Sequence, residues 1–158
     1  MFTPILMLVT LTLPYAVSRF LTIWRGDRGC ERTAAAIGAG LLFLLTASGH
    51  FTQVDAMMQM LPAWVPARQA LVLATGVLEI VIALGFFSRR WRPYAAWAAI
   101  AVLVGFFPVN IYAAFVHAPM GGHAWGPVYL LVRAPLQAVI VAWIWYFLVR
   151  GQPRPWRA

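Results

Sequence analysis

Residues 68–87 read RQALVLATGVLEIVIALGFF. The run is apolar except for Arg68 and Gln69 at its start and for Thr75 and Glu79 within it. A helix needs about 20 mostly apolar residues to cross roughly 30 Å of bilayer hydrocarbon. The run is therefore long enough to span a membrane, and it carries one acidic side chain near its middle. Ionisable side chains at that depth are rare and costly, which marks Glu79 as a candidate functional residue.

Four further runs of similar length and composition lie at 3–24, 33–50, 94–116 and 127–149. Over the 158 residues, 63% are hydrophobic and 10% are charged. A soluble domain is about 45–50% apolar and roughly 25% charged, so these values exclude both a soluble domain and a disordered chain. The sequence predicts one all-α transmembrane domain over residues 1–158, a polytopic helical bundle of five spans in a lipid bilayer.

The arginines predict how the chain is oriented. The net charge is +8, and all 12 basic residues are Arg. Most fall after the first, third and fifth spans, as Arg19, Arg25, Arg28 and Arg32, then Arg89, Arg90 and Arg92, then Arg150, Arg154 and Arg157. The positive-inside rule then predicts a multi-pass inner-membrane protein whose N-terminus is outside and whose C-terminus is cytoplasmic. Because these clusters form no continuous basic face, we expect no nucleic-acid partner.

A few polar residues lie within or beside the spans. An unpaired charge in the bilayer centre costs at least about 2.5–3.5 kcal/mol, so we expect Glu79 and Arg133 to form an ion pair. Gly76 leaves space beside Glu79, and Pro108 and Pro135 each release a backbone carbonyl in their spans. Five side chains from four spans are expected to converge in the outer half of the bundle: His50, Glu79, Asn110, Arg133 and Gln137.

Two interpretations of this cluster stay open. It could be a structural network that fixes helix register, or an outward-facing pocket for the polar head of an amphiphile such as a quinone. In the pocket, Arg133 and Gln137 would hold carbonyl oxygens, His50 would donate a hydrogen bond and Glu79 would carry a proton. The protein would then serve a redox system, with a redox partner protein or as a homo-oligomer. The alternatives are a non-enzymatic carrier or binding protein for a lipid or small metabolite, and a structural subunit of a membrane complex. Whether it catalyses a reaction stays open.

The two loops that are predicted to lie outside, 50–66 and 117–126, contain methionine and histidine. Thioether and imidazole groups are ligands that Cu(I) accepts, and Met57, Met60, His117 and His123 are the candidates here. The stretch 55–64 is equally typical of a short interfacial amphipathic helix, in which Met only fills space. We predict no metal site. Cys30 is the only cysteine, which excludes an intrachain disulfide.

Six short stretches, in order along the chain, resemble the DoxX family of small bacterial membrane proteins. They are GHF (49–51), MLPAWVP (60–66), TGVLE (75–79), AAW (95–97), FPVN (107–110) and RAPLQ (133–137). The resemblance covers roughly residues 34 to 147. It implies a four-helix membrane bundle over 33–149, with residues 1–24 as an added N-terminal span. It also implies a link to quinone-reducing sulfur oxidation, to oxidant stress or to metal-associated gene clusters, and its motifs include the five clustered polar positions.

Overall fold

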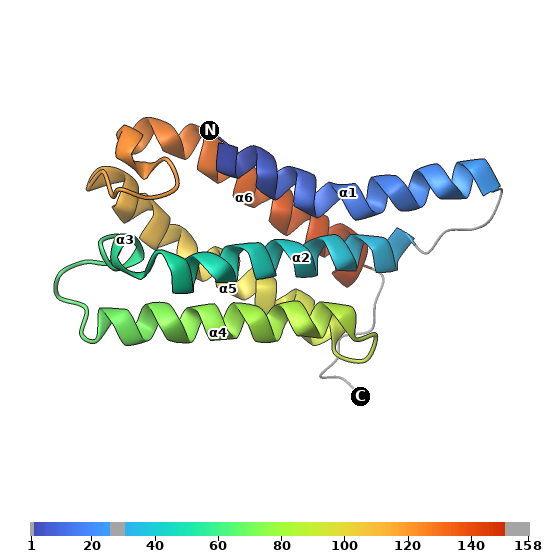
Figure 1. Cartoon of the computed structure of the whole chain (residues 1–158), viewed down its shortest axis with the longest axis horizontal. Coiled ribbons are helices and arrows are strands. Elements are labelled where there is room, and N and C mark those ends of the chain that lie inside the picture. Colours follow the sequence, from blue (N-terminus) through green and yellow to red (C-terminus); the bar gives the residue numbers. More distant parts are fainter. Residues whose placement is uncertain (1, 26–30, 151–158) are drawn as a thin grey trace.

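The computed structural model describes residues 2–25 and 31–150. Over these residues the chain folds into helices without any strand (Figure 1). In chain order the elements are α1 (Phe2–Arg25), α2 (Glu31–Thr52), α3 (Val54–Met58), α4 (Arg68–Phe87), α5 (Arg92–Phe115), the 3₁₀ helix η1 (His123–Tyr129), α6 (Leu130–Ile144) and the π-helical turn η2 (Trp145–Val149). The predicted all-α fold class is confirmed.

Five helical segments of the described chain are long and apolar enough to cross a membrane. They are Thr3–Trp24, Glu31–Thr52, Arg68–Phe87, Arg92–Phe115 and His123–Val149. Each overlaps one predicted span, and the first and third have the predicted bounds. The fifth begins earlier than predicted because η1 leads into α6, with a kink at Gly126, whose φ is 74°. This is the architecture of a multi-pass membrane protein.

The bundle has two chemically different ends (Figure 1). The beginning of α2, the α4–α5 turn and the end of η2 share one end, which we call the arginine end because Arg32, Arg89, Arg90, Arg92 and Arg150 lie there. The opposite end carries α3 and η1, and we call it the loop end. Successive helices run in alternate directions between them. Five of the arginines that were predicted to share one side of the membrane therefore lie at one end of the bundle, while Arg28, Arg154 and Arg157 lie outside the described residues.

Two glycines of α2 set how closely its neighbours approach. A Cβ atom on Gly38 would collide with the backbone carbonyl of Leu11 in α1. A Cβ on Gly40 would lie 2.7 Å from the ring of Phe87 in α4. Gly38 and Gly40 thus allow close contacts of α2 with two different helices. Small residues have this role in membranes because lipid supplies no hydrophobic drive for helix association.

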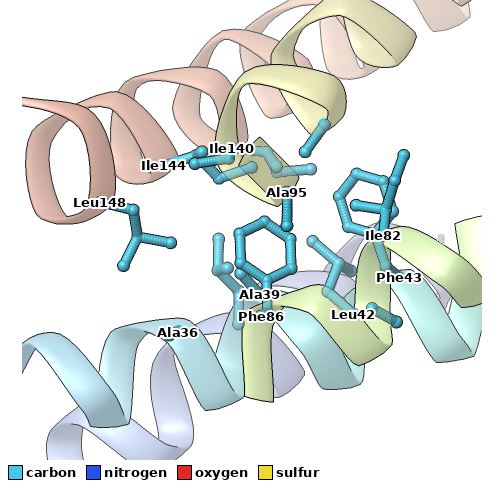
Figure 2. Close-up of a cluster of buried hydrophobic side chains, with 14 of the residues drawn as sticks. Ala36, Ala39, Leu42, Phe43, Ile82, Phe86, Ala95, Ile140, Ile144 and Leu148 are labelled. Atoms are coloured by element: carbon cyan, nitrogen blue, oxygen red, sulfur yellow. The ribbon is translucent and has the colours of Figure 1, made fainter. Parts of the chain in front are cut away.

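The buried apolar core lies towards the arginine end (Figure 2). Phe43 of α2 and Phe86 of α4 meet at its centre, with ring centroids 5.9 Å apart. Ala95 of α5, Ile140 and Ile144 of α6 and Leu148 of η2 complete it. Arg92 is the buried charged side chain at this end in the described part of the chain, whereas Asn110 and His123 are buried nearer the loop end.

Helix neighbours decide which polar side chains can meet. α2 packs against α1 on one side and α4 on the other, and α4 also contacts α5. α6 packs against α5, η1 and the first helix, α1. In Figure 1, α2 lies between α4 and the pair formed by α1 and α6. A polar residue of α4 therefore faces α2, while one near the beginning of α6 faces α1.

Candidate functional site

The Glu79 carboxylate lies at the interface between α4 and α2. The residue is 6% exposed. Thr46 Oγ1 donates a hydrogen bond of 2.7 Å to Glu79 Oε2, and His50 Nε2 lies 3.7 Å from Glu79 Oε1. The first distance is that of a strong hydrogen bond, and the second is within ion-pair range but too long for a direct hydrogen bond. Both carboxylate oxygens of Glu79 thus have partners on the neighbouring helix.

The His50 ring is held in one orientation. Its Nδ1 lies 2.8 Å from the carbonyl oxygen of Val72 and 3.1 Å from Thr75 Oγ1. A carbonyl only accepts, so Nδ1 carries a hydrogen and Nε2 is the atom that gains or loses a proton beside Glu79. Gly76 makes the approach possible, because a Cβ at this position would lie 2.6 Å from the Cβ of His50. His50 and Glu79 therefore form an imidazole–carboxylate pair between α2 and α4.

The predicted ion pair between Glu79 and Arg133 is wrong. Among the described residues, Glu79 has its ion-pair partner in His50, and Arg133 takes part in no salt bridge. The two charges are close enough to attract each other, but they form no ion pair. The physical reason is helix arrangement: α4 turns Glu79 towards α2, whereas α6 turns Arg133 towards α1.

The guanidinium of Arg133 has almost no polar partner in the described part of the chain. Its Nη1 lies 3.8 Å from the sulfur of Met7 in α1, and a thioether is a weak acceptor. Its Nε is buried and has no hydrogen-bond partner. The residue as a whole is partly exposed, although this nitrogen is buried. Arg133 is thus a cation in an apolar setting that lacks an acceptor.

Gln137 and Asn110 do not join Glu79 or Arg133 through hydrogen bonds. Gln137 Nε2 donates to the Leu103 carbonyl of α5 at 2.6 Å, and it so ties α6 to α5. That carbonyl is adjacent to the one of Val104, which Pro108 leaves without its helical donor. Asn110 is buried, and its Nδ2 donates to the Phe106 carbonyl of its own helix at 3.0 Å. Of the five predicted residues, the structure brings only His50 and Glu79 into direct contact.

His123, at the beginning of η1, is the second histidine with a fixed ring. It is 3% exposed, and its Nδ1 lies 2.7 Å from the Met120 carbonyl. The ring packs edge-on against Tyr129, with centroids 5.0 Å apart. Its Nε2 is buried and has no partner among the described residues. Arg133 is near enough for its charge to act on this ring.

The residues examined as metal ligands are spread over the loop end. The methyl groups of Met57 and Met120 both approach Gly49, where a Cβ would lie 3.1 and 3.7 Å from them. His117 is exposed, with its Nε2 against Gly126, while His123 is buried. Met60 lies just beyond α3, in the turn that ends this short helix. In the described part of the chain, no three His, Cys, Asp or Glu side chains gather as a metal site.

Three contributors to these sites were not predicted from the sequence. Thr46 lies four residues before His50 and donates to Glu79, and Thr75 lies four residues before Glu79 and contacts His50 Nδ1. Each threonine therefore shares a helix face with one member of the pair and contacts the other member across the interface. This four-residue spacing could have identified both threonines from the sequence. Met7 gave none, because its contact with Arg133 depends on how α1 packs against α6.

Comparison with known proteins gives one family. A family model described as "Domain of unknown function (DUF8561)" matches residues 39–148, which is more than half of the chain. The matched segment extends from α2 into η2 and includes all five predicted site residues and His123. Comparisons with curated proteins and with solved structures give no match. The chain belongs to the DUF8561 family.

Proposed function

We propose that this multi-pass membrane protein binds the polar head of a quinone or a similar amphiphile, and that Arg133 holds this head. The observation that carries the proposal is the guanidinium of Arg133, which has only the Met7 thioether as a polar contact among the described residues. An unpaired cation in hydrocarbon costs at least about 2.5–3.5 kcal/mol. Carbonyl or anionic oxygens of a head group would supply the missing acceptors.

The other polar residues support this site in different ways. Gln137 donates to the Leu103 carbonyl and so ties α6 to α5 one turn beyond Arg133, whereas Asn110 donates to the Phe106 carbonyl within α5. Glu79 is the proposed proton carrier. Its partner is His50, whose Nε2 faces the carboxyl group and can exchange a proton with it.

The proposed setting is the inner membrane, with the loop end outside. Arginines gathered at the opposite end support this orientation through the positive-inside rule. The resemblance to DoxX proteins, some of which belong to a quinone-reducing enzyme, supports the choice of a quinone. It also supports a role as component of a redox system, beside a partner protein or as a homo-oligomer.

The proposal is tested by binding of a short-chain benzoquinone to the purified protein in lipid nanodiscs, followed through quenching of tryptophan fluorescence. We expect Arg133→Gln to weaken binding at least tenfold, because the acceptor oxygens lose their charged donor. Arg133→Lys keeps the charge but loses the planar fork, and should give an intermediate loss. Arg89→Gln is the matched control, since Arg89 is exposed in the turn at the opposite end.

Equal affinity of the wild type and Arg133→Gln would contradict the proposal. If Arg133→Gln lowers the stability of the protein and no quinone binds to the wild type, the polar cluster has a structural role only. In that case the protein is a structural subunit.

A further inference from the structure

The loop end holds two buried polar nitrogen atoms that have no partner among the described residues, Nε2 of His123 and Nε of Arg133. Buried polar groups in proteins are nearly always hydrogen-bonded, so each unpartnered atom requires an explanation. Two such atoms in one part of a membrane bundle point to a common ligand.

Tyr129 connects the two residues. The His123 ring packs edge-on against the Tyr129 ring. Tyr129 has helical backbone angles and lies four residues before Arg133, so both side chains are on one helix face. Arg133 is also near enough for its charge to act on the His123 ring. We call His123, Tyr129 and Arg133, with Met7 from α1, the loop-end site.

The two nitrogen atoms require opposite partners. Arg133 can only donate hydrogen bonds. His123 Nδ1 lies against the Met120 carbonyl and must donate to it, so the neutral ring presents Nε2 as an acceptor. The neutral form is the consistent one, because a second positive charge buried near Arg133 would be repelled. The loop-end site therefore offers a charged donor and a neutral acceptor to the same occupant.

We propose that the ligand head carries an O–H group that donates to His123 Nε2, together with an oxygen that accepts from Arg133. A quinol and a protonated carboxylic acid both have this chemistry. The inference rests on the proposed function, because it names the chemistry of the head that Arg133 holds. It replaces His50 by His123 as the ligand-binding histidine, since His50 is occupied by Glu79 and Val72.

Matched probe pairs test this inference on the purified full-length protein in nanodiscs. The first pair is a short-chain hydroquinone and its dimethyl ether, and the second is a medium-chain fatty acid and its methyl ester. Both pairs are measured at a pH below the pKa of the fatty acid, so that its carboxyl group is protonated. Methylation then removes the O–H donor and keeps the rest of the molecule. We expect the donor-bearing member of at least one pair to bind the wild type at least tenfold more tightly. The pair that shows the preference distinguishes a ring head from an acyl head.

Substitutions test whether His123 Nε2 is the atom that causes the preference for the O–H donor. His123→Phe keeps an aromatic ring beside Tyr129 but removes the acceptor, and should reduce the preference below threefold. His123→Gln retains an acceptor oxygen and should keep part of the preference. His117→Phe is the control, because His117 is exposed. Arg133→Gln should weaken both members of the pair alike.

The outcomes separate the two proposals. If probes bind in an Arg133-dependent way but the wild type shows no preference for the O–H donor, this inference is overturned and the proposed function stands. A preference that His123→Phe leaves unchanged overturns it as well. If no probe binds the wild type, both proposals fail. The comparison of matched probes on the wild type needs no variant, so a misfolded variant does not prevent the test.

Discussion

His50 Nε2 and Glu79 Oε1 lie 3.7 Å apart across the interface between α2 and α4, and this contact gives Glu79 an ion-pair partner inside the protein. Arg133 has no such partner in the described part of the chain. The two buried charges are therefore not equivalent. Loss of Glu79 should be felt mainly as a loss of stability, and loss of Arg133 mainly as a loss of ligand binding.

Glu79→Ala should lower the free energy of unfolding by about 2–4 kcal/mol, because it removes the charged partner of His50 and leaves the Thr46 hydroxyl only the Phe43 carbonyl as acceptor. Glu79→Gln keeps an acceptor for Thr46 and should cost less. Glu31→Ala removes the exposed pair with Arg19 and should leave the free energy of unfolding nearly unchanged, because solvent screens this pair. Unfolding in detergent measures all three, and equal losses for Glu79→Ala and Glu31→Ala would contradict the described contacts.

Gly38→Ala should loosen α1 from α2, because the added Cβ collides with the Leu11 carbonyl. Overpacking of this kind costs about 1–3 kcal/mol. Gly105→Ala is the matched control, since a Cβ there meets nothing within 4 Å. It should be neutral or should stabilise the helix by up to about 1 kcal/mol. Unfolding measurements, together with a disulfide cross-link engineered between α1 and α2, distinguish the two; equal behaviour would refute the close crossing.

Gly76→Ala should separate His50 from Glu79, because its Cβ would lie 2.6 Å from the Cβ of His50. A double-mutant cycle of His50→Gln and Glu79→Gln measures the coupling between the two side chains. We expect a coupling energy of about 0.5–3 kcal/mol in the wild type and a value near zero in the Gly76→Ala background. An undiminished coupling in that background would mean that Gly76 does not control the approach.

Arg92→Ala should destabilise the arginine end by about 1.5–3 kcal/mol, which is the range for hydrogen bonds to charged groups. Arg92 is buried, and its Nε donates to the Phe86 carbonyl at 3.1 Å, near the C-terminus of α4. A cation there also complements the helix dipole. Arg90→Ala, at an exposed position of the same turn, should change the unfolding free energy by less than about 0.5 kcal/mol. Similar losses for both variants would show that Arg92 does not have this role.

The spans could be predicted from the sequence because each depends on the composition of its own segment. The third predicted span, 68–87, has the bounds of α4. Pairing between helices could not be predicted in this way, because it depends on which helices are neighbours and on how each is rotated about its axis. For this reason the contact of Glu79 with His50 and Thr46 was missed, and an ion pair with Arg133 was expected instead.

His123 shows a second limit of sequence analysis. It lies beyond the predicted fifth span, 127–149, and so it was assigned to an exposed loop. The turn at Gly121 and Gly122 and the kink at Gly126, all with positive φ, instead return this stretch against the bundle and bury the ring. Only the fold shows that His123, and not His50, has an unpartnered nitrogen near Arg133.

The most direct test of the central claim is native mass spectrometry of the protein released from its own membrane. We predict that the spectra show a small molecule bound to the wild type and to Arg89→Gln, and that this molecule is absent from Arg133→Gln. A wild-type protein that carries no such molecule, or one that persists unchanged in Arg133→Gln, would contradict the assignment of Arg133 as the residue that holds the ligand.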